Sequence, residues 1–189
     1  MTLAKPTEQD ERKLHAEVNQ IVNQRFLLTT LAVTVFGVIT AWLIPREAPS
    51  TPEPLGAFRF AAAVLLETML FLLFLLGHML SGMLRTIASY MEVTKASEWE
   101  QAWRTFRQRR YLGYTKPQAI VFLALGVLGA GTPFAIWASV PQYNLEPRAG
   151  VLLLIGVGLL YLLFVSGMSF FRWFDPEDSA RHRWEELNR

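Results

Sequence analysis

Four long apolar stretches constrain what this chain can fold into more than any other feature of its sequence. They run over residues 26–44, 61–84, 119–138 and 150–171, and Glu67 is the only Asp, Glu, Lys or Arg in them. A helix needs about 20 apolar residues to cross the hydrocarbon core of a bilayer. The sequence therefore predicts an all-α integral membrane protein with four transmembrane helices and a cytoplasmic helical layer.

The composition favours a membrane location over a soluble helical bundle. Hydrophobic residues make up 52% of the 189 residues, and charged residues make up 18%, below the about 25% of ordinary soluble domains. A soluble bundle of these helices would need much more polar surface to cover it. Charged residues precede the first apolar stretch, so we expect no cleavable signal peptide.

Lys and Arg are distributed unevenly among the segments that connect the spans. The segments 1–25, 85–118 and 172–189 hold fifteen of the 18 basic residues, and the proline-rich loops 45–60 and 139–149 hold three. Basic residues favour the cytoplasmic side of a membrane. We therefore expect a multi-pass protein of the bacterial inner (plasma) membrane, with both termini and the 85–118 segment in the cytoplasm.

The first 25 residues are expected to continue the first span as one long helix. Thr7 can cap this helix, and neither Gly nor Pro interrupts it before Gly37. Leu14, Val18 and Ile21 are spaced by four and three residues, which is the pattern of a short coiled-coil seam. This seam serves either self-association or packing against neighbouring loops.

Three polar residues share one face of this helix just before the membrane. Glu17, Gln20 and Gln24 lie beside Val18 and Ile21. In a symmetric assembly, such side chains form stacked rings that select or block ions, and the five residues together are candidates for a pore or gate. In a single copy the polar residues form a solvated stripe.

Two polar residues share a face of the second span. Glu67 and His78 are eleven residues apart, which places them within about 20° of each other around a helix. An ionised acid is costly in lipid, so this face is expected to point inward. It lines a pore or proton path, or else Glu67 is a buried acid bonded to a neighbouring helix.

The 85–118 segment combines aromatic and basic residues. Trp99, Trp103 and Phe106 form a helical stripe beside Arg104, Arg107, Arg109, Arg110 and Lys116, and Gly113 and Pro117 are expected to end the helix before the third span. A basic run near a membrane binds anionic lipid headgroups. Arginine with exposed aromatic rings is also typical of single-stranded nucleic-acid binding, so an oligonucleotide is the alternative ligand.

No catalytic motif is present, and we expect no catalytic residue, metal or cofactor. The sequence has no nucleophile elbow, phosphate-binding loop or zinc-protease motif. It contains no cysteine, and its three histidines are far apart. An enzyme is therefore the least favoured class.

The segment before the first span resembles a known family. Glu17-Val18-Asn19-Gln20, followed by Asn23, Gln24 and Arg25, is similar to the N-terminal signature of small bacterial membrane-channel effectors of anti-phage defence, the Hailong type. The resemblance implies a homotetrameric channel gated by its N-terminal helices and held closed by DNA oligomers from a partner nucleotidyltransferase. It concerns Glu17, Val18 and Gln20, and many such effectors have two spans where this chain has four.

These observations together predict an oligomeric membrane channel or pore-forming effector that is gated from the cytoplasmic side. The resemblance adds antiviral defence and control by a nucleic-acid or nucleotide ligand. The alternative is a non-conducting membrane scaffold that recruits a cytoplasmic partner protein.

Overall fold

The computed structural model describes residues 7–45, 50–94, 115–140, 142–144, 148–170 and 177–187. The main elements in this part of the chain are the long helices α1 (Glu8–Leu43), α2 (Ala57–Val93), α4 (Thr115–Ser139) and α5 (Arg148–Phe170), and the shorter α6 (Glu177–Leu187). Each of the four long helices is long and apolar enough to cross a membrane. The predicted fold class, an all-helical protein with four such helices, is confirmed.

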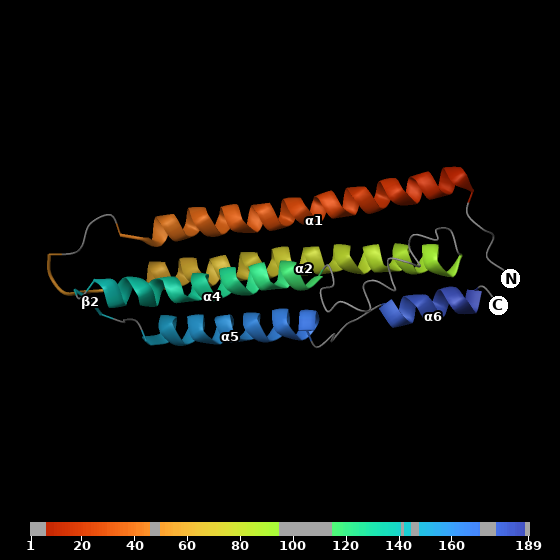
Figure 1. Cartoon of the computed structure of the whole chain (residues 1–189). Coiled ribbons are helices and arrows are strands. Elements are labelled where there is room, and N and C mark those ends of the chain that lie inside the picture. Colours follow the sequence, from red (N-terminus) through yellow and green to blue (C-terminus); the bar gives the residue numbers. More distant parts are fainter. Residues whose placement is uncertain are drawn as a thin grey trace.

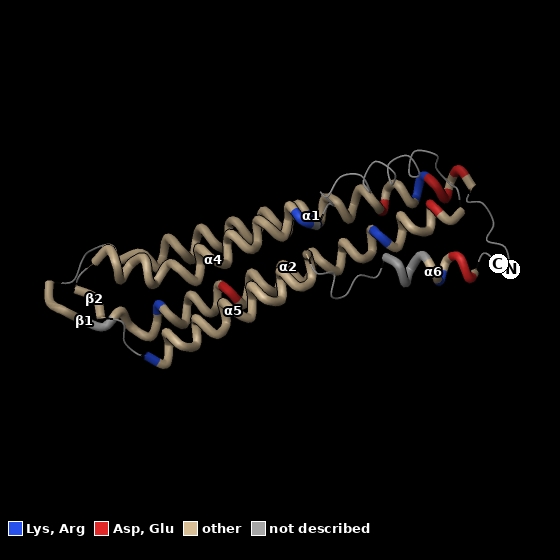
Figure 2. Tube along the Cα trace, turned by 60° about the horizontal axis from the view of Figure 1, so that its bottom comes forward, with Lys and Arg blue, Asp and Glu red and all other residues tan. Residues whose placement is uncertain are grey.

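The four long helices lie side by side (Figure 1). α1 and α2 extend beyond α4 and α5 at the end where both chain termini lie, and α6 lies beside the extension of α2. Figure 2 shows charged residues gathered on these extensions. Further along the bundle, toward the β1–β2 end, the helices have a long stretch without Lys or Arg. The extensions and α6 therefore form a polar layer outside the apolar bundle.

The N-terminal helix starts where the sequence predicts. Thr7 is the N-cap, its hydroxyl accepts a hydrogen bond from the Asp10 backbone, and the Asp10 carboxylate accepts in return from the Thr7 backbone at 3.1 Å. This reciprocal capping box satisfies two donors at the helix start. α1 then continues without interruption to Leu43, as expected.

The third apolar helix begins two residues before Pro117. α4 begins at Thr115, so Pro117 lies in its first turn, whereas Gly113 and the expected end of the preceding helix lie outside the described residues. The amide groups of a first turn need no partner within the helix, so proline is tolerated there. Residues 85–93, by contrast, continue α2 as a helix, as predicted.

The two loops at the far end of the bundle are joined by a short parallel pairing. β1 (Glu53–Pro54) pairs with β2 (Tyr143–Asn144), and Leu55 donates to the Asn144 carbonyl at 3.0 Å. The Arg59 guanidinium lies 4.9 Å from the centre of the Tyr143 ring. These contacts tie the α1–α2 connection to the α4–α5 connection.

The core has two parts. Leu66, Leu70, Phe122 and Tyr161 belong to a buried cluster in the middle of the bundle, which α1 joins through Ala32. A second cluster, which includes Leu43, Phe60 and Leu154, lies toward the β1–β2 end. α2 contributes to both clusters and contacts every other described helix, so it is the central helix of the fold.

Candidate functional site

Glu67 is the one acid in the membrane-spanning stretches, and its side chain is completely buried. Neither carboxyl oxygen has a hydrogen-bond partner among the described residues, although the Ala130 backbone interacts with the group. A Cβ atom at Gly129 would lie 2.8 Å from Glu67 Oε1. The carboxyl group therefore lies directly against the α4 backbone, in space that only glycine leaves open.

Tyr161 of α5 packs against α4 at Gly126, about one helical turn before Gly129. Its ring occupies the space beside Gly126 that a side chain would fill. Its hydroxyl donates a 2.6 Å hydrogen bond to the Phe122 carbonyl, and it interacts electrostatically with Glu67. Gly126 and Gly129 thus accept two polar side chains, one from α5 and one from α2, into the same three-helix contact.

His78 does not join this site. It is half-buried, and its ring packs against Phe74 with the ring centres 6.0 Å apart. Phe74 also packs against Phe122, and Phe71 packs against Tyr161. These two phenylalanines lie between Glu67 and His78 along the same face of α2, so the two polar residues are separated by aromatic packing.

A second polar contact ties α1 to α4 on the side of the helical extensions. Arg25 donates to Gln118 Oε1 through Nη2 at 2.7 Å and through Nε at 3.3 Å, and Gln118 Nε2 donates to Thr29 Oγ1 at 3.4 Å. Gly77 of α2 leaves room for the Gln118 amide. Sequence reasoning missed Gln118, because a single glutamine at the edge of an apolar run carries no signal.

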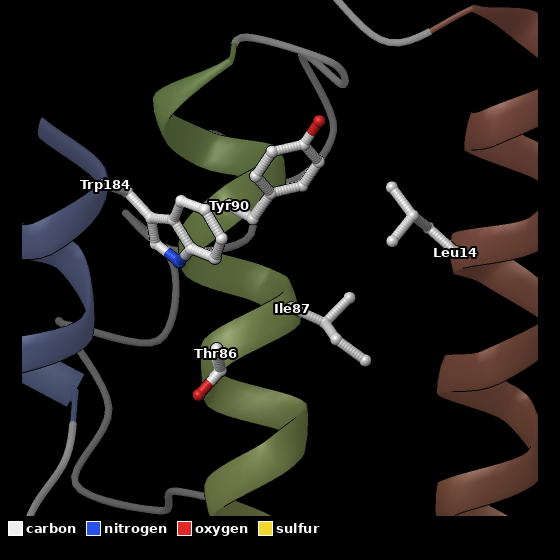
Figure 3. A pocket seen from close by; sticks show the side chains of 5 residues that line it. All are labelled: Leu14, Thr86, Ile87, Tyr90 and Trp184. Atoms are coloured by element: carbon white, nitrogen blue, oxygen red, sulfur yellow. The ribbon is translucent and has the colours of Figure 1, made fainter. Parts of the chain in front are cut away.

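The predicted seam on α1 has neighbours within the same chain. Ile21 is buried, and Leu14 and Val18 are half-buried. Leu14 faces Ile87 and Tyr90 of α2 across a pocket of about 200 Å³, which Thr86 and Trp184 also line (Figure 3). At least at Leu14, the seam is therefore turned toward α2 and α6.

The polar residues of the same helix segment are placed differently. Glu17, Gln20 and Gln24 are all exposed. They contribute to a wider exposed face, because α1 is the least covered of the long helices: 11% of its most apolar stretch is buried, against 28–44% in the other three.

This exposed face of α1 carries a stripe of small and polar residues that Leu27 interrupts. Its members are Gln20, Asn23, Leu27, Thr30, Thr34, Gly37 and Ala41, all of them exposed, and we call this set the α1 stripe. At 100° per residue they span about 100° of the helix surface. They lie opposite the buried residues Ile21, Ala32 and Leu43.

Of the predicted basic residues that follow α2, the structure describes only Lys116. Arg104, Arg107, Arg109 and Arg110 lie outside the described residues. Lys116 is described, and it is half-buried in the first turn of α4.

The fold places the chain in the class of multi-pass membrane proteins with four apolar helices. Beyond this class the comparisons with known proteins add nothing: no family model matches the chain, and no curated protein or solved structure shows significant similarity to it.

Proposed function

We propose that this chain is the subunit of a homo-oligomeric membrane channel that is gated from the cytoplasmic side. The observation that carries the proposal is the exposed α1 stripe. Lipid-facing positions elsewhere in the bundle hold large apolar residues such as Leu152, Leu159 and Phe164. The centre of the exposed α1 face instead holds Thr30, Thr34, Gly37 and Ala41.

Residues of this kind favour contact between helices in a membrane. Small side chains allow two backbones to approach closely, and hydroxyl groups can bond across the contact. The hydroxyls of Thr30 and Thr34 donate to the carbonyls of Phe26 and Thr30, so their oxygen lone pairs remain available to an ion or a neighbour. The exposed residues Phe26, Val33 and Val38 flank the stripe with apolar surface for packing.

Charge on the helical extension supports a parallel arrangement of α1 helices. If Asn23 and Thr30 take d positions of a heptad, Arg12 falls at g and Glu17 at e, a spacing that pairs neighbouring parallel helices. Arg12 bonds Glu8 of its own helix, and both side chains are about four-fifths exposed. The guanidinium can therefore also reach Glu17 of a second copy.

A polar stripe that faces a symmetry axis also supplies a path for ions. With four copies, the number that the family resemblance implies, Gln20, Asn23, Thr30 and Thr34 would form successive rings of amides and hydroxyls. The Glu17 and Gln24 side chains lie at the cytoplasmic mouth of this path. The extensions of α1 and α2 together with α6 are then the parts that open or close it.

Single-cysteine cross-linking tests the assembly, because the natural sequence contains no cysteine to interfere. Thr34→Cys and Gly37→Cys are expected to form disulfide-linked dimers in membranes. Leu159→Cys, at similar depth on the exposed face of α5, is the matched control and should remain monomeric. Cross-linking at Leu159→Cys but not on α1 would contradict the proposed interface.

Conductance of the purified full-length chain in planar bilayers tests the channel itself. The wild type should conduct, and Thr34→Leu should sharply lower the current, because it adds a second apolar ring to that of Leu27 and a longer apolar constriction expels water. Leu159→Ala should leave the current unchanged. An α1 cross-linked assembly without any current would support the alternative function, a non-conducting scaffold.

Control by an oligonucleotide in antiviral defence rests on the resemblance and on the four arginines of the basic run. Replacing Arg104, Arg107, Arg109 and Arg110 by Gln should abolish binding of short single-stranded DNA to the detergent-solubilised protein. Binding by the wild type should weaken by about one log unit per log unit of salt for each phosphate contact. Undetectable binding by the wild type would leave anionic lipid as the ligand of this run.

A further inference from the structure

We infer that Glu67 is a proton-binding site, in which the neutral carboxylic acid donates a hydrogen bond to the backbone carbonyl of Gly129 and ties α2 to α4 inside the membrane. This inference does not rest on the proposed channel. It rests on the burial of Glu67, on the geometry of Gly129, and on a proline one helical turn further along α4.

Within the part of the chain that the structure describes, no positive charge acts on Glu67. The spans of α1, α4 and α5 contain no acidic or basic residue, and Tyr161 of α5 is the titratable group that interacts with Glu67. On α2 itself, the nearest titratable group within the span is His78, with Phe71 and Phe74 between. An unpaired carboxylate in such a place is very costly, whereas the neutral acid costs far less once its proton has an acceptor.

α4 provides that acceptor. Pro133 lies inside the helix and is fully buried. Proline has no backbone N–H, so the carbonyl four residues earlier, that of Gly129, loses its helical donor. Gly129 is also the residue beside which Glu67 Oε1 lies, because a Cβ atom there would be 2.8 Å from that oxygen, and the next residue, Ala130, interacts with the carboxyl group through its backbone. A carboxyl group that needs an acceptor therefore lies beside the residue whose carbonyl needs a donor, and we infer the hydrogen bond from this proximity.

The glycines make this contact possible. A Cβ atom at Gly129 would lie 2.8 Å from the Glu67 oxygen and 3.2 Å from Leu66 Cδ2. Gly126, three residues earlier, leaves the corresponding space for Tyr161, whose hydroxyl already donates to Phe122. Tyr161 thus covers the site on the α5 side, and its hydroxyl proton is used in the hydrogen bond to the Phe122 carbonyl.

Infrared spectroscopy tests the protonation state directly. At about pH 8, exposed carboxyl groups are ionised, and the C=O stretching band of a neutral carboxylic acid should come from Glu67 alone. We expect this band in the wild type and its loss in Glu67→Gln, which retains a donor of similar shape. Absence of the band from the wild type, or its persistence in Glu67→Gln, would overturn the inference.

A double-mutant cycle tests the acceptor. Glu67→Leu should lower the thermal unfolding midpoint, and Glu67→Gln should lower it less, because the amide still donates. Pro133→Ala returns an N–H to the Gly129 carbonyl, so in that background Glu67→Leu should cost a smaller shift of the midpoint. Equal shifts in both backgrounds would exclude Gly129 as the partner.

A spectroscopic measurement covers the case in which the leucine variants do not fold. In Pro133→Ala alone, the Glu67 band should change frequency, because its hydrogen bond competes with a restored helical bond. An unchanged band in the folded Pro133→Ala variant would also exclude Gly129. None of these results depends on whether the protein conducts, so the two proposals can fail separately.

Discussion

At the scale of single residues, glycines decide which polar side chains enter the bundle. Gly77, Gly126 and Gly129 each lie against a side chain from a neighbouring helix: Gln118, Tyr161 and Glu67. Other glycines, such as Gly131 of α4 and Gly156 of α5, have open space where a side chain would begin. Because all of these residues are glycines, only their positions in the structure decide which of them contacts a side chain of a neighbouring helix.

This difference gives the first prediction at this scale. Gly126→Ala should destabilise the fold by about 1–3 kcal/mol, because the new methyl group overlaps the Tyr161 ring in a packed contact. Gly156→Ala on α5 should be neutral or slightly stabilising, since nothing lies within 4 Å of its added methyl. Unfolding of the two variants in mild detergent compares them, and equal stabilities would refute the packing assigned to Tyr161.

At the scale of elements, the capping box at the start of α1 links helix stability to pH. The Thr7 hydroxyl and backbone amide both bond the Asp10 carboxylate and lower its pKa below the usual 3.8. Because the pKa is lowered in the folded helix, the cap stabilises fully above pH 3.8. This contribution is lost as the pH falls through the lowered value.

The prediction is that Thr7→Ala returns the pKa of Asp10 toward 3.8, because it removes the hydroxyl that makes the largest contribution. A nuclear magnetic resonance titration of the Asp10 carboxyl carbon in both proteins measures the change. Thr40→Ala in the same helix is a control that should leave Asp10 unaltered. An Asp10 pKa that is the same in wild type and Thr7→Ala would show that the cap is not formed in solution.

At the scale of the whole molecule, the extensions of α1 and α2 place both chain termini at one end of the bundle, as Figure 1 shows. An even number of spans requires this arrangement, and the distribution of Lys and Arg predicts that this end lies in the cytoplasm. The prediction is that a cytoplasmic reporter is active when fused after Arg189, and that a periplasmic reporter is active when inserted at Ser50 or Thr51. The opposite pattern of activities would reverse the assigned orientation.

The sequence by itself determined the four apolar helices, their approximate ends and the unbroken α1. These features depend on local properties: length, apolar character, a capping residue and the absence of Gly or Pro. The position of Pro117 in the first turn of α4 also has a local reason, since proline is tolerated there.

Only the tertiary structure decided which surfaces meet. The pattern of Leu14, Val18 and Ile21 was compatible with self-association, but Leu14 faces α2, and the opposite α1 stripe is the one left exposed. Glu67 could be placed on an inward face from its spacing, whereas its contact with Gly129 depends on how α2 and α4 are aligned. Periodicity fixes the angle of a residue around its own helix, but the neighbour it meets is set by packing between helices far apart in the sequence.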